Sequence, residues 1–429
     1  MHIAIHSLFL IATSTGACPA PDDEGWRELF DGKTLDGWVT KGGRYDGNAN
    51  WRVEDGALTG SEGENHAGGL IYTAQRYSDF EIELDAYITH PFDSGIFVRM
   101  TPDAKGAQVT LDYRPDGEVG GIYSDGYLFH NKEGKERYKR DEWNHLRVRC
   151  TGDPMHIVTW MNGELLTDFQ LPEHKGEYAT NGLIGLQVHG SRNDPAGSHV
   201  KFKNIRVKDL SDFESDAKGF LTPNRSGEAR GWKPLFNGKD LSGWEEVGDG
   251  GYEAKDGVMK FLVKGGSPHI VTKEDFEDFD LRLDFKISKM ANSGLFLRGK
   301  RGSDNPAYSG CEMQILDDFN YEAVTGSTLK KWQFSGSLYG AVAPRTSALH
   351  PLGEWNTYEV RCEGSRMRCV LNGIILYDVD TQAADFKVAQ GPPFAERAKK
   401  GFIGLQRHAP SEVEGDAYAW FRNIWIREL

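Results

Sequence analysis

Apolar and polar residues alternate along many short stretches of this chain. Between Phe279 and Ile287 every second residue is apolar, and polar or charged residues fill the positions between them. Successive side chains of a strand point to opposite sides, so this spacing predicts strands with one buried and one solvated face. Tight turns are predicted between strands at Asp-Gly and Asn-Gly pairs such as Asp256-Gly257. No long stretch has a helical period, and the pattern therefore predicts an all-β chain of the two-sheet sandwich or jelly-roll type.

The same motifs occur twice along the chain. Residues 94–99 (SGIFVR) recur as 293–298 (SGLFLR), and residues 185–187 with His189 recur as 404–406 with His408. Further matches follow in the same order: 28–38 with 234–244, 79–85 with 278–284, 142–144 with 354–356 and 202–205 with 421–424. A repeat of this length, roughly 190 residues, has the size of a domain and far exceeds a solenoid unit. We therefore predict two tandem β-sandwich domains, 24–210 and 231–429, joined by a polar linker at 211–230.

The first residues differ from the rest. Residues 3–17 are mostly apolar and end in small residues before Cys18. The stretch is too short to cross a bilayer as a helix, and it predicts a signal peptide over residues 1–20. The chain is therefore expected to be exported, to the periplasm or the extracellular space. Gly16-Ala17-Cys18 also resembles a bacterial lipobox, which would place a lipid on Cys18. Simple secretion is preferred, because Thr15 stands where that motif favours Leu.

Net charge and composition limit the classes of binding partner that are expected. The 429 residues carry a formal net charge of -14, which disfavours nucleic acid and anionic membranes. A neutral sugar is not disfavoured, so carbohydrate remains the expected partner, and a lipid on Cys18 is the one membrane link predicted. The oligomeric state is left open.

Cysteines suggest neither zinc nor a firm disulfide. Cys362 and Cys369 flank a turn, and symmetric pairing about that turn would set them opposite each other. The first copy has Cys150 and Ile157 at the matching places, which favours two unbonded, buried thiols. No CxxC or Cys/His cluster indicates a zinc site.

Polar side chains gather on one face of the second copy. Strand alternation places three pairs on matching sides of three strands: Phe296 with Arg298, Glu312 with Gln314, and Gln406 with His408. Aromatic rings stack on sugars, while Arg, Gln and carboxylates hydrogen-bond hydroxyls, so this set suits carbohydrate binding. Any one of these residues alone would more often be solvated or structural.

The motifs 235–244 (LFNGKDLSGW), 292–298 (NSGLFLR), 312–317 (EMQILD), 353–356 (GEWN) and 421–424 (FRNI) resemble the 3-keto-disaccharide hydrolase family. That family has a concanavalin-like jelly-roll fold, and the resemblance covers nearly the whole mature chain, twice. It implies that the chain is a hydrolase of glycosides already oxidised at C3. A base would remove the C2 proton, the aglycone would leave C1, and water would then add.

Site roles are our assignment on the matched positions. His408 or Glu312 is expected to be the base and Arg298 the enolate stabiliser. The expected substrate-binding residues are Gln314, Gln406, Phe296, Asn292 and Asp317. No cofactor is firmly expected, and a divalent metal is left open.

The first copy departs from these motifs. Its counterparts are His189, Gln187, Arg99 and Gln108, but Asp93 replaces Asn292 and the 312–317 motif is lost. We therefore expect the second copy to carry the main site.

Two alternative functions are also compatible with the sequence. A non-catalytic carbohydrate-binding protein would have a shallow groove without a buried titratable group. An ordinary glycosidase would have two carboxylates, such as Glu312 and Asp317, facing each other.

Overall fold

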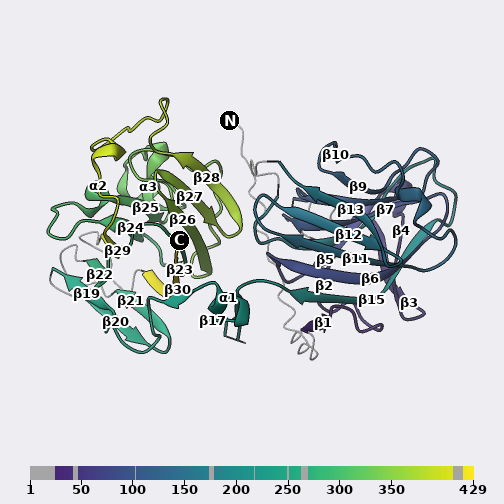
Figure 1. The fold of residues 1–429 in the computed structure, drawn as a ribbon, viewed down its shortest axis with the longest axis horizontal. Helices are drawn as coiled ribbons and strands as arrows, with labels where there is room; N and C mark the ends of the chain where they lie inside the picture. The colour runs from purple at the N-terminus through teal and green to yellow at the C-terminus, as the bar shows by residue number, and fades with distance from the viewer. Residues whose placement is uncertain are drawn as a thin grey trace. The chain divides into compact units, whose positions relative to one another are not determined.

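The computed structural model describes residues 25–41, 47–101, 103–172, 178–216, 218–248, 251–261, 269–408 and 419–429. The chain divides into two compact units, Met1–Ser211 and Asp212–Leu429, coloured purple to teal and teal to yellow in Figure 1. The predicted signal peptide and Cys18 lie outside the described residues, and export stays a prediction. Among the described helices, none has the length and apolar character needed to cross a membrane.

The first domain is built from two antiparallel sheets. The larger has the order β13-β12-β11-β6-β15-β4-β3, with β1 paired to β15. Its strands are β1 (Trp26–Glu28), β3 (Asn50–Glu54), β4 (Ala57–Ser61), β6 (Phe80–Ile88), β11 (Asn144–Thr151), β12 (His156–Met161), β13 (Glu164–Gln170) and β15 (His199–Asp209). The smaller has the order β10-β9-β8-β7-β14-β5-β2. Its strands are β2 (Trp38–Val39), β5 (Gly69–Thr73), β7 (Asp93–Met100), β8 (Ala107–Asp112), β9 (Val119–Tyr123), β10 (Tyr127–Phe129) and β14 (Leu183–Val188), and the short helices η1 (Glu64–His66) and η2 (Gly134–Glu136) lie between strands.

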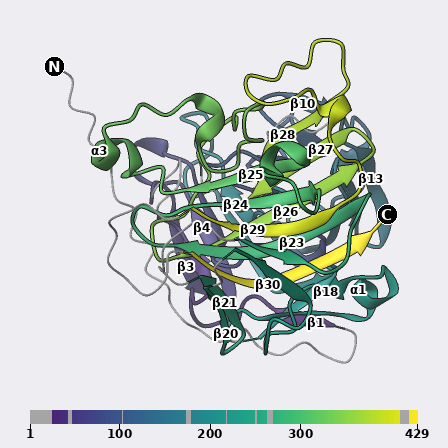
Figure 2. The same cartoon turned by 90° about the vertical axis from the view of Figure 1, so that its left-hand side faces the viewer.

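The second domain repeats this plan with a narrower small sheet. The larger sheet has the order β20-β21-β30-β23-β26-β27-β28, with β18 paired to β30. Its strands are β18 (Lys233–Pro234), β20 (Tyr252–Lys255), β21 (Val258–Phe261), β23 (Phe279–Ile287), β26 (Trp355–Glu363), β27 (Arg366–Leu371), β28 (Ile374–Asp380) and β30 (Ala419–Glu428). The smaller sheet has the order β19-β22-β29-β24-β25, and Figure 2 shows β24, β25 and β29 side by side. Its strands are β19 (Trp244–Val247), β22 (His269–Thr272), β24 (Asn292–Gly299), β25 (Cys311–Leu316) and β29 (Phe402–Arg407), with helices α2 (Pro306–Ser309), α3 (Tyr321–Thr325), η3 (Lys331–Gln333) and η4 (Phe394–Glu396) in the connections.

The core of each domain lies between its two sheets. In the second domain, Phe279, Leu281 and Leu283 of β23 are buried and pack in one cluster with Leu295 and Leu297 of β24. The first domain has its own separate cluster of the same kind. Burial of these aliphatic and aromatic side chains is the main force holding the sheets together, at roughly 1.5–3 kcal/mol for each large residue. The alternation predicted for this strand and the all-β, tandem jelly-roll fold are confirmed.

Residues 211–230, predicted as a polar linker, carry regular structure. The segment contains a hairpin of β16 (Phe213–Ser215) and β17 (Leu221–Pro223), followed by helix α1 (Arg225–Ala229). Asn224 caps α1, since its side chain accepts hydrogen bonds from the amides of Ser226 and Gly227. The segment belongs to the second unit, which begins at Asp212.

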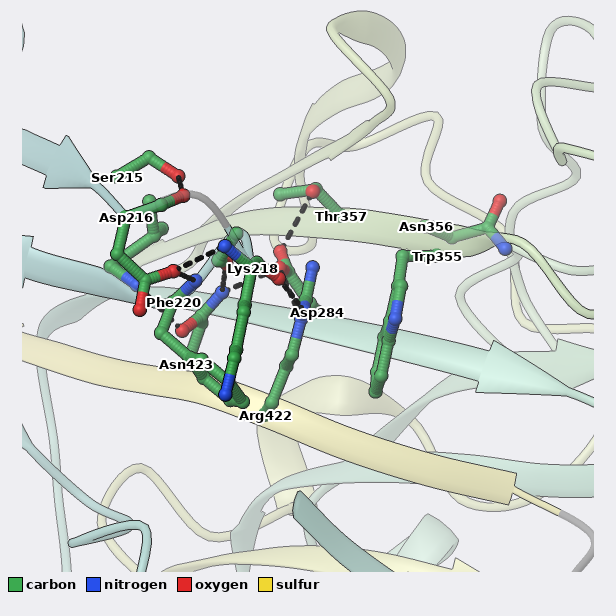
Figure 3. A network of polar contacts seen from close by, with 12 residues as sticks. Ser215, Asp216, Lys218, Phe220, Asp284, Trp355, Asn356, Thr357, Arg422 and Asn423 are labelled. Atoms are coloured by element: carbon green, nitrogen blue, oxygen red, sulfur yellow. Dashed lines mark hydrogen bonds and ion pairs between the residues drawn. The ribbon is translucent and has the colours of Figure 1, made fainter. Parts of the chain in front are cut away.

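Side chains of β30 hold this segment in place (Figure 3). Arg422 donates to the carbonyl of Lys218 at 2.8 Å, and its guanidinium lies between the rings of Phe220 and Trp355. Asn423 donates to the carbonyl of Gly219 at 2.8 Å. Backbone groups of the hairpin are thereby satisfied by the second domain, which explains why a polar composition here does not mean a free linker.

The cysteines of the described chain are unbonded and buried. Cys362 pairs in register with Met367, and Cys369 pairs with Val360. The hairpin turns between Gly364 and Ser365, one residue earlier than opposite cysteines would need. The symmetric pairing is therefore wrong, and the alternative of two buried thiols is confirmed.

Candidate functional site

The predicted polar residues of the second domain lie on the outer face of its smaller sheet. Gly294 of β24 pairs with Gln314 of β25 on one side and with Gln406 of β29 on the other. His269 of β22 pairs with Gln406 and completes this row. In the next row, Phe296 lies between Gly404 and Glu312. The sheet thus brings Glu312, Gln314 and Gln406 together, as their alternation predicts.

Glu312 is the most unusual group on this face. Its side chain lies over Gly294, where an added Cβ would stand 2.1 Å from Oε1, so glycine is needed there for space. The residue is only 3% exposed, and no described residue forms a hydrogen bond or ion pair with its carboxylate. Burial raises the pKa of Glu312 from 4.5 to about 8. A carboxyl group with this pKa can take up and release a proton near neutral pH.

Aromatic residues from two connections border Glu312. Tyr339 donates its amide to the Glu312 carbonyl at 2.9 Å. Its ring contacts Trp332 at 5.2 Å and Tyr308 of α2 at 6.5 Å between centroids. Burial raises the pKa of both tyrosines, and the charge of Glu312 raises both further. These aromatic residues were not among the predicted site residues, because they lie in irregular connections where strand alternation gives no signal.

His269 was also missed. Its ring meets Phe296 edge-on at 5.6 Å, and burial lowers the pKa of His269. The repeat itself could have revealed it, because the first copy has Leu70 at the same place in the sheet, paired with Gln187. A titratable histidine at a position where the other copy has leucine indicates a functional role.

Phe296 lies on the predicted face but does not offer a free ring. It is 2% exposed and packs with Val271, Ala307 and Phe402 under α2. The expectation that it stacks on sugar is therefore wrong. By packing in this cluster, Phe296 supports the part of the sheet next to Glu312, its partner on β25.

Gln314, Asn292 and His408 surround the same region. Gln314 is buried, and its Oε1 accepts from the amide of Ile315 at 3.1 Å. Asn292 donates to the hydroxyl of Tyr321 at 3.4 Å, and its carbonyl accepts from the amide of His408 at 3.1 Å. His408 is exposed at the end of β29, directly before residues 409–418, which lie outside the described chain.

Arg298 does not share the face of Glu312, and this prediction is wrong. A bulge interrupts the pairing of β24 with β29 between Phe296 and Gly299, and Arg298 has a φ of 54°. The bulge turns its side chain toward the larger sheet. There it donates to the carbonyls of Glu277 at 2.6 Å and Gly364 at 2.8 Å, and to Asp278 at 2.9 Å. Arg298 is a buried brace between the sheets.

Asp317 is likewise committed to the fold. Its Oδ2 accepts from the amide of Met290 at 2.8 Å, and its Oδ1 accepts from the amides of Phe319 and Asn320 at 3.2 Å each. The residue is fully buried. It shapes the loop after β25, and the expectation that it contacts substrate is not met by this geometry. The neighbouring Asp318 accepts from the amide of Ser335 at 3.0 Å, and burial raises its pKa to about 7.

The first domain places a different set on the same face. Gln108 stands at the position of Glu312, and its Nε2 donates to Oε1 of Gln187 at 2.6 Å. Arg99 braces the sheets as Arg298 does, with donations to Ser78, Gly152 and Asp79. His189 lies 3.8 Å from Asp93, and burial lowers its pKa.

Nothing within the described chain forms a ready metal centre: no group of three His, Cys, Asp or Glu side chains there could hold an ion. An open hollow of about 540 Å³ lies near Thr40, Trp51 and Arg52 of the first domain. It contains none of the predicted site residues.

Comparison with known proteins places the chain in a family. The family described as 3-keto-alpha-glucoside-1,2-lyase-like domain matches residues 25–208 and again residues 231–427. The chain belongs to this family. Both copies are matched, which confirms the resemblance and the tandem repeat.

Proteins similar to this chain include a named hydrolase and proteins of known structure. The 3-keto-disaccharide hydrolase of Bacteroides thetaiotaomicron is 28% identical over 281 residues, which cover 57% of this chain and 90% of that protein. A crystal structure from Parabacteroides distasonis, named "a putative glycosyl hydrolase", is 28% identical with a TM-score of 0.43, and covers 48% of this chain and 98% of that one. A second from the same organism is 32% identical with a TM-score of 0.38, over 46% of this chain and 99% of that one.

Proposed function

We propose that the second domain cleaves glycosides that carry a ketone at C3, by elimination and hydration, with Glu312 as the base. Family membership and the name of the Bacteroides relative support the substrate class. The observation that carries the assignment is Glu312 itself: a buried carboxyl on the outer sheet face, bordered by tyrosines and glutamines.

The chemistry explains why such a group is needed. A ketone at C3 acidifies the C2–H bond, and the aglycone at C1 lies β to the resulting carbanion. Glu312 takes the C2 proton, the electron pair forms the C1–C2 double bond, and the aglycone leaves as its alcohol after gaining a proton. Water then adds hydroxide at C1 and a proton at C2, which regenerates the 3-keto sugar. A base whose pKa is raised to about 8 is better matched to a carbon acid than an ordinary carboxylate.

The enolate oxygen formed at C3 needs donors, and Arg298 faces the wrong way to provide them. Tyr308 and Tyr339 take this role in our proposal. Each lies close enough to Glu312 for its charge to affect the tyrosine's pKa. Preorganised donors at a developing oxyanion contribute about 10²–10³ in rate. The amides of Gln314 and Gln406 would orient the ring hydroxyls.

His408 is proposed to protonate the departing aglycone. Histidine is the side chain that most often serves as a general acid in enzymes. His408 stands at the exposed end of β29, beside Asn292, where a leaving group could reach solvent.

The two alternative functions fit less well. A two-carboxylate glycosidase needs a second acid facing Glu312, but the carboxylates of Asp317 and Asp318 accept backbone amides of their own loops. A simple binding surface has no use for a buried, unpaired carboxyl, which costs stability.

The deciding experiment is cleavage in D₂O. A 3-keto disaccharide and its unoxidised parent are incubated with the full chain, and products are analysed by NMR. We expect cleavage of the oxidised sugar alone, with deuterium at C2 of the released 3-keto sugar beyond the slow exchange of the free ketone. Comparable cleavage of the parent, or product without enzyme-dependent C2 label, would contradict the elimination mechanism.

A further inference from the structure

The smaller sheet of the first domain has two full strands beyond β8, where the described second domain has isolated bridges, Met313 with Leu338 and Leu338 with Val342. It continues past β8 into β9 and β10, whereas the described sheet of the second domain ends at β25. Tyr123 of β9 pairs with Gln108 of β8, and Tyr127 of β10 pairs with Tyr123. Directly paired side chains share a face, so both tyrosines lie on the outer face beside Gln108.

These tyrosines are exposed at 39% and 37%, and their rings meet at 5.5 Å. Tyr127 also stacks on His130 at 4.5 Å, and His130 is held by Glu118 at 2.7 Å. A Cβ added to Gly121 would lie 2.8 Å from the Tyr127 ring, so this glycine lets the ring lie close to the sheet. The result is a built aromatic platform.

Polar groups continue from this platform along β8. Gln108, Thr110 and Asp112 alternate onto one face, and four residues of strand span about 13 Å. Arg114 donates to both Asp112 and Asp93 at 2.7 Å each, which fixes the two carboxylates side by side. Gln108 is fixed by Gln187, as described above. These contacts hold the Gln, Asp and Arg side chains in fixed positions, and a few precisely placed polar groups are typical of ligand-binding sites.

We propose that this face of the first domain, from Tyr123 and Tyr127 to Asp112 and Arg114, binds a neutral disaccharide without cleaving it. Aromatic rings cover the C–H face of one sugar, while the Gln, Asp and Arg groups take the hydroxyls of the next. Asp93 and Asp112 flank Arg114, and Glu118 holds His130 beside Tyr127, so carboxylates outnumber arginines on this face and anionic sugars are disfavoured. Gln108 stands where the second domain has the unpaired Glu312, and the buried acids of this face, Asp93 and Asp112, are both paired with Arg114. The inference stands whether or not Glu312 is catalytic.

Binding is tested on the full chain with Glu312→Gln, so that turnover in the second domain does not affect the result. Maltose and cellobiose, both unoxidised, are titrated and followed by saturation-transfer NMR and calorimetry. We expect binding, and a loss of roughly tenfold in affinity for Tyr127→Ala. Asp112→Asn should weaken binding, and Tyr127→Phe should restore it by keeping the ring.

Two matched controls locate the site. Leu165→Ala removes an exposed apolar side chain from the larger sheet of the same domain, and Tyr308→Ala removes a tyrosine of the second domain. Leu165→Ala should not change the affinity, and Tyr308→Ala should leave in place the binding that Tyr127→Ala weakens, whatever it does to a sugar in the second domain. Unchanged affinity in Tyr127→Ala, loss of binding only in Tyr308→Ala, or no binding of either sugar with a Kd below about 10 mM would overturn the proposal.

Discussion

The smaller sheets of the two domains share a frame but differ in the groups on their outer faces. Glu312 in the second domain corresponds to Gln108 in the first, and His269 corresponds to Leu70. Conversely, Asp112 of the first domain stands where the second has Leu316. One face therefore contains a buried acid without a partner, Glu312, whereas the buried acids of the other, Asp93 and Asp112, are paired with Arg114. The difference separates a surface fit for proton transfer from one fit for binding.

What the two copies share teaches the opposite lesson. Arg298 and Arg99 lie at the same bulge with φ of 54° and 48°, and each binds an aspartate, Asp278 or Asp79, directly before a strand of the other sheet. An arginine that is retained when the chemistry around it changes belongs to the fold. For this arginine, identity between the repeats marks a structural role, whereas the exchange of Glu312 for Gln108 marks a difference in function.

The largest effect should come from exchanging the acid and the amide. Glu312→Gln removes the base and should lower kcat/KM for a 3-keto disaccharide by about 10²–10⁴. Gln108→Glu, the reverse change in the first domain, should leave the rate within about twofold, because proton transfer does not take place there. Steady-state kinetics with thermal melts as a folding check would measure both. Equal losses for the two variants would contradict the division of roles.

The pH profile of the same reaction sharpens the assignment. A base must be ionised, so kcat/KM should rise about tenfold per pH unit and level off near pH 8, where Glu312 titrates. The measurement is kcat/KM between pH 5 and pH 9, and the product yield is checked for loss of the substrate itself. A rate that is flat or falls across this range would exclude Glu312 as the base.

Stability should depend on pH in the second domain for the same reason. The pKa of Glu312 is higher in the folded state, about 8, than the ordinary 4.5, so the folded state holds the proton more tightly. The contribution of Glu312 to the stability of the folded state is therefore greatest below pH 4.5 and is lost as the pH rises to about 8. At about 1.4 kcal/mol per unit, the loss is at most about 5 kcal/mol. Denaturant melts of the parent and Glu312→Gln should diverge with rising pH, with the variant more stable at pH 8; identical pH dependence would contradict this.

The braces should behave alike in both domains. Arg298→Met and Arg99→Met each remove the arginine donor from two carbonyls and from an aspartate that keeps one backbone amide donor, and each should cost about 3 kcal/mol in its own domain. Calorimetry of the full chain can separate the two unfolding transitions. If Arg298→Met instead lowered turnover at an unchanged melting temperature, Arg298 would have to be assigned a role in the reaction.

The smallest effect concerns the segment between the domains. Asn423 and Asn204 occupy matching positions, and each binds an aspartate, Asp284 or Asp85. Asn423 also holds the carbonyl of Gly219 and the amide of Leu221. Asn423→Ala should cost about 1–2 kcal/mol and speed proteolysis within 211–230, while Asn204→Ala, at an exposed site, should do neither. Equal protease sensitivity would show that the segment is held by other contacts.

Much of the site could be predicted from strand alternation alone. Glu312, Gln314 and Gln406 share a face because β25 and β29 stay regular through these residues. Prediction failed where regularity ends. The bulge after Phe296 reverses Arg298, and the loop after β25 draws the Asp317 carboxylate onto its own amides. Tyr308 and Tyr339 lie in connections whose paths no periodicity describes.

The amino-acid sequence by itself determined the all-β fold, the duplication and the family, because period-two alternation and repeated motifs are local properties that survive without coordinates. Only the tertiary structure decided which side chains are buried and which form hydrogen bonds that stabilise the fold. Burial is what raises the pKa of Glu312, and it depends on Gly294 leaving room above a neighbouring strand. Hydrogen bonding between the sheets is what removes Arg298 from the face. Both effects join residues far apart in the chain, so only the packed domain brings them about.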